Sequence, residues 1–399
     1  MNERAAYIGP TILLTLIQAM VSWAVFAPPV LAKQALPTMG IDPAWIGLQP
    51  TIVFVAATIS SMVSGGVVAR FNPMRASQIL LLLAAAGSAL IATGDLVIGA
   101  LGSILIGIAL GPTTPASSHI LSRLTPRGMQ PLIFSIKQTG VPLGGALAGF
   151  VGPPLTLLWG WQSAILVIAL ACLAVALITE LWTRGYADFA DASRKISLEL
   201  IGPLRLVLQS PVLRWMLMGC VPLVVIQYAL TTFIVLYLQE DIGLSVITAG
   251  AVLAVAQASG GTGRILFGAI ASRFVTPLTM LLLLSLLAAA AAFLTASFTQ
   301  SWPLAMIYAV GVLFGAGAAG WNGVYLAEVA RLAPAGEVSR VTGAVGFVIF
   351  TGVVIGPAVF TGLVAVFSFQ IAYACMGVMM LTSVLAFLRA AVHVRASSS

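Results

Sequence analysis

Charged residues are scarce in this sequence, at 7% of 399 residues, whereas 60% of the residues are hydrophobic. A soluble domain carries about a quarter charged residues, because its surface must face water. The composition therefore excludes a water-soluble globule of this size. In lipid, every backbone polar group must be bonded within the protein, and without an alternating strand pattern only helices can span. We predict an all-α integral membrane protein that resides in a lipid bilayer.

Residues for catalysis or metal binding are also few. The three cysteines, Cys172, Cys220 and Cys375, each lie in a separate apolar run, where a free thiol acts as a small hydrophobe. Two histidines, His119 and His393, and no carboxylate deep in an apolar run leave little material for an intramembrane enzyme. A sensor would need a sizeable soluble domain, and an ATP-driven pump would need a GxxxxGKS/T loop. We expect no enzyme activity, no cofactor and no metal.

A helix needs roughly 20 apolar residues to cross a bilayer. The sequence contains twelve apolar runs of similar length. Six precede and six follow the longest polar segment. This pattern predicts a six-helix bundle in residues 1–183, a linker in 184–211 and a second six-helix bundle in 212–399. The predicted spans are Ile8–Val30, Trp45–Ala69, Gln78–Thr93, Val97–Ser122, Pro131–Leu155, Gln162–Trp182, Val212–Leu238, Val246–Ser272, Pro277–Phe298, Pro303–Val329, Val341–Val364 and Phe369–Leu388.

Basic residues gather at one end of these spans, and Lys33 alone lies in a loop on the other side. By the positive-inside rule, both termini and segment 184–211 are expected in the cytoplasm. The net charge of +7 is thus topological and indicates no nucleic acid partner. The N-terminus shows no signal-peptide cleavage site, and we expect a multi-pass protein of a bacterial inner (plasma) membrane. The basic residues on the cytoplasmic side are Arg4, Arg70, Arg75, Arg123, Arg127, Arg184, Arg194, Lys195, Arg205, Arg214, Arg273, Arg331, Arg340, Arg389 and Arg395.

Three short motifs recur in the same order, six spans apart. GGVVARF (65–71) matches GAIASRF (268–274), RLTP (123–126) matches RLAP (331–334), and a Thr-Gly-Val triplet with a following Gly occurs in the fifth and eleventh spans. One such match could be chance, but the ordered set indicates a duplication. An even number of helices per repeat keeps both halves in the same orientation.

On these motifs, the chain resembles the major facilitator superfamily over its whole length. The resemblance implies two pseudo-symmetric six-helix bundles and secondary transport by alternating access around a midplane site. Gly65 with Arg70, and Gly268 with Arg273, match the family's cytoplasmic loop motif G-x-L-a-D-R-x-G-R.

The acidic position of that motif is Ala69 in one half and Ser272 in the other. In the family this Asp helps to latch the cytoplasmic gate, so the resemblance implies a weaker or differently built latch here. Glu328 and Arg331, at the end of the tenth span, are candidates for the missing charge pair.

The fifth span contains GVPLGG, which resembles the family antiporters' G-P-x-x-G-G motif with Pro142 one place late. The alternative is purely structural. Gly140, Gly144, Gly145 and Gly149 form a small-residue ridge that permits close helix packing without any antiport.

Two cations lie inside predicted spans, where charges are costly and usually face the bundle interior or a water-filled cavity. Lys137 is about 9 Å along its helix from the cytoplasmic end, and Arg264 is about 13 Å inward from Arg273. The family fold implies that these two residues lie near one another. Two structural alternatives remain: Lys137 could snorkel to the interface, and Arg264 could bond helix-end carbonyls.

Arg264 also carries a resemblance at the subfamily level. In GRILFG it stands where monocarboxylate and oxalate-type members carry an arginine that meets the substrate carboxylate. The monocarboxylate branch has an Asp one turn earlier, and here that position is Gly260, so its particular proton coupling is not implied. A cavity with cations and no deep carboxylate should attract anions. A bidentate contact with Arg would recognise a carboxylate directionally.

Neutral polar and aromatic residues could complete the substrate site, although each could equally serve as interhelical packing. His119 could titrate near neutral pH, or be structural. In the family, the first, fourth, seventh and tenth helices line the central path, and the fourth offers Thr113, Thr114 and Ser117. The other candidates are Gln18, Trp23, Gln227, Tyr228, Gln257, Trp321, Asn322 and Tyr325.

The leading hypothesis is a monomeric secondary transporter of a small organic anion, a carboxylate, coupled to protons by symport or to another solute. The alternative is proton-driven efflux of amphipathic, drug-like compounds, which the glycine motif and apolar cavity walls favour. Efflux of cations normally needs a buried Asp or Glu, which this sequence lacks.

Overall fold

The computed structural model of this protein describes residues 5–40, 48–190 and 201–396, and within these ranges the chain is helical, with no strand. This confirms the predicted all-α class. The first part of the chain forms α1 (Ala5–Thr38), α2 (Leu48–Arg70), α3 (Pro73–Ile91), α4 (Leu96–Leu124), η2 (Arg127–Met129), α5 (Gln130–Gln138), α6 (Gly140–Thr183) and η3 (Arg184–Phe189). The second part forms α7 (Gly202–Gln209), α8 (Pro211–Glu240), α9 (Val246–Arg273), α10 (Pro277–Ala296), α11 (Leu304–Ala319), α12 (Asn322–Leu332), α13 (Val338–Val366) and α14 (Phe369–Ala396).

Local sequence signals explain where several helices begin. The first N–H groups of a helix have no intrahelical acceptor, and short polar side chains satisfy them. Asn72 accepts from the backbone of Met74 and Arg75 at the start of α3, and Asp95 accepts from Ile98 at the start of α4. Thr276 caps α10 in the same way, ahead of a proline at the first helical position.

Ten segments of the described chain are long and apolar enough to cross a membrane. The longest, Arg127–Phe189, contains Gly160 with φ 83°, which interrupts α6 and divides the segment into two passes. Helix α9 is not among the ten, but its 28 residues extend about 42 Å, enough to cross a bilayer. With α6 divided and α9 added, the described residues supply the twelve predicted passes.

Several predicted boundaries are wrong. Helix α1 continues to Thr38, so Lys33 lies in a helix rather than in a loop. The predicted tenth span is two helices, α11 and α12, with a break at Gly320 and Trp321. The fifth span breaks between α5 and α6 at Thr139. Of the basic residues used to predict orientation, Arg4, Arg194 and Lys195 lie outside the described residues.

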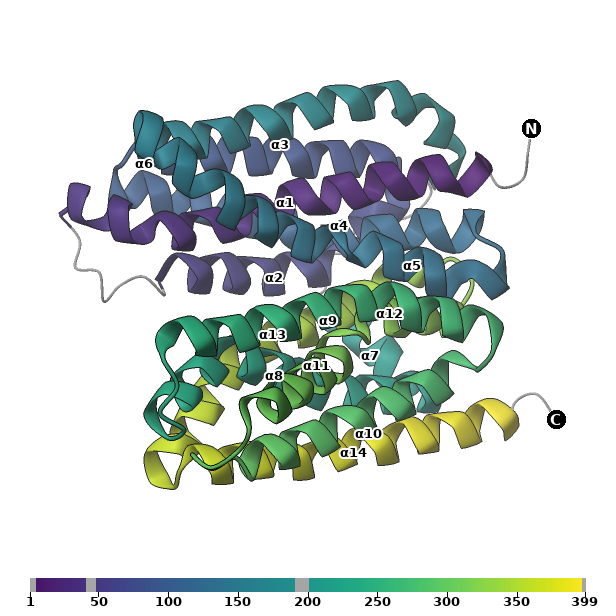
Figure 1. Cartoon of the computed structure of the whole chain (residues 1–399). Helices are drawn as coiled ribbons and strands as arrows, with labels where there is room; N and C mark the ends of the chain where they lie inside the picture. The colour runs from purple at the N-terminus through teal and green to yellow at the C-terminus, as the bar shows by residue number, and fades with distance from the viewer. Residues whose placement is uncertain (1–4, 41–47, 191–200, 397–399) are drawn as a thin grey trace. The chain divides into compact units, whose positions relative to one another are not determined.

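The chain forms two compact units. Unit 1 comprises Met1–Pro126, Ile136–Leu206 and Ala333–Phe350, and unit 2 comprises Arg127–Ser135, Val207–Leu332 and Thr351–Ser399. Within unit 1, α1 packs along α6, and α4 lies between α2 and α3 (Figure 1). Within unit 2, α14 packs along both α8 and α10, and α9 packs along α11.

Glycines permit the closest helix contacts inside each unit. A Cβ on Gly107 of α4 would lie 2.3 Å from the Val53 carbonyl oxygen of α2, and one on Gly315 of α11 would lie 1.8 Å from the Ala256 carbonyl oxygen of α9. Such contacts let backbones approach, which stabilises helix pairs where no water is present to drive association.

Large apolar side chains also cover much of the outside. Phe150, Leu157, Leu181 and Ile247 are each more than 80% exposed. An exposed apolar surface of this kind suits a lipid environment rather than water.

Candidate functional site

Lys137 lies at the centre of a polar cluster inside unit 1. Its side chain is only 2% exposed. Its Nζ donates to Gln18 Oε1 at 2.7 Å, to Gln138 Oε1 at 3.2 Å and to Thr114 Oγ1 at 3.5 Å. An ammonium has three N–H donors, and here each has one neutral oxygen acceptor. We call these four residues the lysine cluster.

One partner of Lys137 is its sequence neighbour Gln138, the last residue of α5. Adjacent residues of a regular helix do not face each other, yet Gln138 reaches the neighbouring Lys137. Helix α5 ends at Gln138, and the Thr139 N–H turns back to the Ile136 carbonyl at 3.0 Å before α6 begins. Thr139 itself keeps helical dihedral angles, with φ −67° and ψ −16°.

Two glycines at the start of α6 bring α1 against the lysine cluster. A Cβ on Gly140 would lie 2.7 Å from Gln18 Cβ, and one on Gly144 would lie 2.5 Å from Ser22 Cβ. The packing interpretation thus has a physical basis at these two positions. Gly145 has one contact at 3.7 Å and Gly149 has none within 4 Å, so the predicted ridge of four glycines is wrong in extent.

Helix α1 contributes two further polar groups. Gln18 Nε2 donates to Ser22 Oγ at 3.3 Å, which fixes the amide with its oxygen toward Lys137. Trp23 is 6% exposed, and its indole N–H has no acceptor among the described residues. A buried unpaired donor is costly, so Trp23 is a candidate ligand contact.

The amine of Lys137 therefore does not snorkel to an interface. It is held by α1, α4 and α5 side chains, and no carboxylate is among its partners in the described part of the chain. Among the described residues, the buried ionised side chains are Lys137, Arg264 and Glu328, and Glu328 is paired with Arg331. In the described part of the chain, the acceptors of the Lys137 amine are neutral side-chain oxygens.

Arg264 is the buried cation of unit 2, with 5% exposure. Its Nε donates to the carbonyl of Ala319 at 2.9 Å, and Tyr228 is an electrostatic neighbour. Ala319 is the last residue of α11, where carbonyls lack intrahelical partners. The structural alternative for Arg264, a hydrogen bond to a helix-end carbonyl, is thus present in the structure. It does not by itself decide whether Arg264 also binds substrate.

A second polar group in unit 2 surrounds Gln227. Its Oε1 accepts from Trp321 Nε1 and from Asn322 Nδ2, both at 3.2 Å. Trp321 stands in the break between α11 and α12, and Asn322 begins α12. The same break therefore supplies the carbonyl for Arg264 and the two donors for Gln227.

The remaining predicted contacts lie apart from these groups. Tyr325 is fully buried and its hydroxyl donates to the Met216 carbonyl at 3.2 Å, a packing contact between helices of unit 2. Gln257 is exposed on α9, and Gly261, one turn on, faces open space. In unit 1, His119 Nε2 is 3.2 Å from the Phe189 carbonyl, which anchors η3 on α4.

The glycines of the cytoplasmic loop motif lie in close contact with neighbouring helices. In unit 1, a Cβ on Gly65 would lie 2.5 Å from Arg340 Cα, near the start of α13. In unit 2, a Cβ on Gly268 would lie 2.4 Å from Ser135 Oγ of α5. Ser272, at the motif's acidic position, accepts from the Leu132 backbone N–H at 3.0 Å. A hydroxyl thus caps the start of α5 where the family motif has a carboxylate.

The charged residues of that motif make local contacts. Arg331 forms two hydrogen bonds with Glu328, at 2.7 and 2.6 Å, within α12. Arg273 stacks over the ring of the adjacent Phe274, with 5.5 Å to the centroid. Arg70 is exposed at the end of α2.

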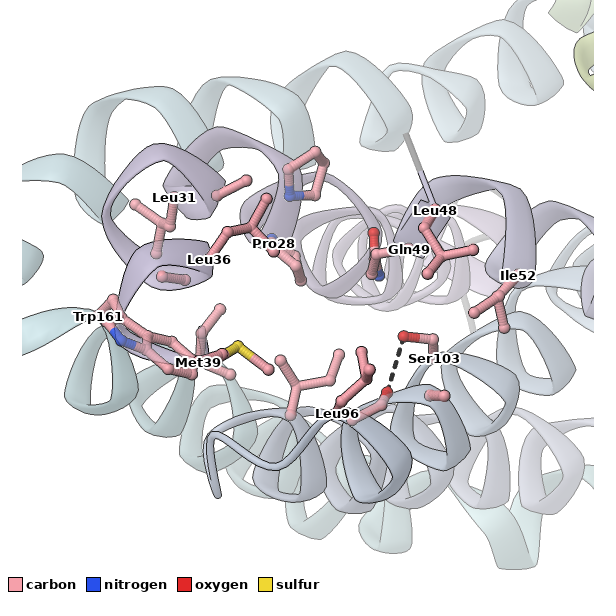
Figure 2. Close-up of a pocket in the computed structure, with 17 residues that line it drawn as sticks. Pro28, Leu31, Leu36, Met39, Leu48, Gln49, Ile52, Leu96, Ser103 and Trp161 are labelled. Atoms are coloured by element: carbon pink, nitrogen blue, oxygen red, sulfur yellow. Dashed lines mark hydrogen bonds between the residues drawn. The ribbon is translucent and has the colours of Figure 1, made fainter. Parts of the chain in front are cut away.

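Unit 1 also contains an apolar cavity of about 100 Å³ (Figure 2). It lies among the last turns of α1 and α3, the first turns of α2 and α4, and the part of α6 that follows Gly160. Most lining side chains are apolar, and the polar ones are Gln49, Ser103 and Trp161.

Three of these features could not be recognised from the sequence. Gln138 is the sequence neighbour of Lys137, but the letters KQTG do not show that its amide oxygen meets the amine. The Ala319 carbonyl is a backbone group, which carries no sequence signal beyond the glycines around it. The cavity beside Gln49 forms only where five separate segments of the chain, from α1, α2, α3, α4 and α6, come together.

A family model described as the Major Facilitator Superfamily matches residues 11–350, which is most of the chain. Solved structures agree over nearly full length. The E. coli fucose:proton symporter FucP has a TM-score of 0.75 at 16% identity, covering 97% of this chain and 99% of that one. The human organic anion transporter MFSD10 has a TM-score of 0.73 at 15% identity, covering 97% and 100%. A bacterial homologue of the iron transporter ferroportin has a TM-score of 0.78 at 14% identity, covering 96% and 99%. At these identities the likeness shows the fold.

Curated relatives match only short segments. The 4-hydroxybenzoate transporter PcaK of Pseudomonas aeruginosa is 35% identical over 74 residues, 18% of this chain and 16% of that protein. PcaK of Pseudomonas putida is 29% identical over 85 residues, 21% and 19% of the two lengths. Each match spans less than a fifth of the relative.

Proposed function

Since the chain belongs to the major facilitator superfamily of membrane transporters, we propose that it moves a small organic anion, a carboxylate, by secondary active transport. The lysine cluster is the observation that carries this proposal. Lys137 is buried in unit 1 with three neutral acceptors and no acidic partner in the described residues. A bound carboxylate would supply the countercharge in a site from which water is largely excluded.

A bound carboxylate could replace the weakest of the three hydrogen bonds of the Lys137 amine. The Thr114 hydroxyl lies 3.5 Å from the amine, at the outer limit of a hydrogen bond. A carboxylate oxygen taking this place would form a shorter, charge-assisted bond while Gln18 and Gln138 remain. The unpaired indole N–H of Trp23 is a further donor on α1.

Arg264 supports the same ligand sign from unit 2. It is a buried cation, and its Nε donates to the Ala319 carbonyl at 2.9 Å. Guanidinium groups recognise carboxylates by paired N–H contacts. We propose that Arg264 also recognises a carboxylate.

Aromatic carboxylates are the first substrates to test, because the matched relatives are named as 4-hydroxybenzoate transporters. The purified protein in proteoliposomes is offered 4-hydroxybenzoate, the uncharged 4-hydroxybenzamide and a lipophilic cation. Saturable uptake restricted to the carboxylate is expected. Uptake of the cation or the amide in its place would favour the drug-efflux alternative.

Lys137→Gln is the decisive variant. It keeps a polar side chain but removes the charge, and we expect the affinity for the anion to fall roughly 10- to 100-fold, the value of one or two charged hydrogen bonds. Arg214→Gln, which removes an exposed cation of α8, is the matched control and should transport normally. Thermal unfolding of each variant separates lost binding from lost folding. Wild-type affinity in a folded Lys137→Gln protein would refute the role of the lysine cluster.

Proton coupling and orientation are also proposals. An inward proton gradient should stimulate carboxylate uptake, and a protonophore should abolish that stimulation. Both termini are proposed to be cytoplasmic in a bacterial inner membrane, and the protein is proposed to act as a monomer. Protease protection of terminal tags in inverted and right-side-out vesicles tests the orientation.

A further inference from the structure

The apolar cavity of unit 1 contains one polar side chain whose hydrogen bonds are unmet. The other polar groups of its lining are paired: Ser103 Oγ donates to the Gly99 carbonyl at 2.9 Å, and Trp161 Nε1 donates to Thr38 Oγ1 at 2.9 Å. The amide oxygen and nitrogen of Gln49 are both buried, and neither has a partner in the described chain. Figure 2 shows the Gln49 side chain between Pro28 and Leu48, with no dashed line to it.

The cavity is separate from the lysine cluster. On α1, the lining residue nearest in sequence to the lysine cluster is Pro28, and Lys137 bonds Gln18 of the same helix. On α4, the corresponding lining residue is Ser103, and Lys137 bonds Thr114. Ten or eleven helical residues separate these positions, which is about 15 Å along each axis.

The lining restricts the chemistry of a ligand. Among the described residues, no charged side chain lines the cavity, so an ionised group would have no charged partner there. A primary amide offers donors and an acceptor, and a hydroxyl group can satisfy both kinds at once. The remaining walls, among them Leu31, Leu36, Met39 and Ile52, suit an aliphatic chain.

The position in the bundle indicates where the ligand comes from. The cavity lies at the ends of α1, α2 and α4, next to the Asp95 cap of α4 rather than at mid-helix. A polar head group near a helix end with a chain running along apolar walls is the arrangement of an amphiphile in a leaflet.

We propose that this cavity binds an uncharged, single-chain amphiphile with a hydroxyl head group, such as a long-chain alcohol or a monoacylglycerol. The hydroxyl bonds the Gln49 amide, and the first carbons of the chain occupy the apolar part of the cavity. This binding is independent of the transported anion.

The test uses the full-length protein in nanodiscs and a photoreactive long-chain alcohol. Labelled peptides are mapped by mass spectrometry, and binding is measured by competition with 1-decanol and with decane. We expect labelling of peptides from the cavity and tighter binding of the alcohol than of the alkane, by roughly five- to tenfold for one net hydrogen bond. Labelling elsewhere, or equal affinity for alcohol and alkane, would overturn the proposal.

Three variants sharpen the test. Gln49→Leu should lower the affinity for decanol to that for decane without changing the latter. Gly99→Leu should abolish both, because a Cβ at this lining position meets nothing within 4 Å and the side chain can fill the space. Gly149→Leu is the control: a Cβ on Gly149 also meets nothing within 4 Å, but this residue of α6 does not line the cavity. This variant should bind both ligands as the wild type does. Unchanged decanol affinity in folded Gln49→Leu or Gly99→Leu protein contradicts the proposal.

Discussion

The two buried cations in the described part of this protein, Lys137 and Arg264, are held in different ways. In unit 1, the Lys137 amine is surrounded by three side-chain oxygens from α1, α4 and α5. In unit 2, the described bond of Arg264 through Nε goes to a backbone carbonyl at the end of α11. The compact ammonium is matched by a cluster of neutral side chains, and the guanidinium by a helix terminus with its negative dipole end.

This difference determines how each site can be altered. The lysine cluster depends on the identity of its side chains, so single substitutions can remove its contacts one by one. The Arg264 contact depends on the break between α11 and α12, so no substitution at Ala319 removes the carbonyl. The two cations should therefore respond differently to exchange of Lys and Arg.

The largest effect is expected for Arg264. Arg264→Gln removes a buried charge and should lower anion affinity by roughly 100-fold or more, since buried charged contacts contribute about 2–5 kcal/mol. Arg264→Lys keeps the charge but loses the Nε geometry, so it should be intermediate. Equilibrium binding of radiolabelled carboxylate measures both. Arg264→Lys with the same loss as Arg264→Gln would mean that geometry, and not charge, decides.

Gln18→Glu places a carboxylate beside Lys137. The new side chain should pair with the amine, as Gln18 Oε1 already lies 2.7 Å away, and should exclude the external anion. We expect affinity for the anion to fall roughly 10- to 30-fold, a loss of about 1.5–2 kcal/mol. Binding and the ligand-induced rise in Tm should be lost together, while Gln18→Met, with no acceptor and no charge, should lose less affinity. A Gln18→Glu protein that binds anion normally would contradict the countercharge argument.

Gly144→Ala tests the packing that supports the lysine cluster. Its Cβ would meet Ser22 Cβ at 2.5 Å and the Ala19 carbonyl oxygen at 2.6 Å, so α1 and α6 must separate. We expect destabilisation of about 1–3 kcal/mol, seen as a lower Tm in detergent. Gly149→Ala has open space and should be neutral or stabilising by up to about 1 kcal/mol. Equal Tm values for the two variants would show that the close approach is unimportant.

The smallest effect is expected for Thr114→Val. Its hydroxyl is 3.5 Å from the amine, so its loss should destabilise the empty protein by about 0.5 kcal/mol or less. Because the anion is proposed to replace this contact, affinity should be unchanged or slightly higher. Isothermal titration of wild type and Thr114→Val compares the two, and a large loss of affinity would place Thr114 in the bound complex instead.

Much of the fold could be predicted from residue types and their order. Scarce charge, apolar runs of spanning length and the ordered repeat of GGVVARF and GAIASRF predicted a twelve-helix member of the major facilitator superfamily, and this is confirmed. These features are local or repeated, so they can be read without knowing which helices meet. The boundaries were less predictable: a charge at Lys33 and prolines in α1 suggested an early end, but that helix continues to Thr38.

The sequence alone indicated that Lys137 and Arg264 lie in apolar spans away from the acids, and this made an anion the ligand to test. The structure adds one acid to the buried residues, Glu328, which pairs with Arg331. Only the tertiary structure decided what these cations touch. Gln18, Thr114 and Gln138 meet Lys137, and glycines at the start of α6 bring α1, with Gln18, close to this point. Such contacts depend on side-chain direction and on helix breaks of one or two residues, which composition and periodicity do not record.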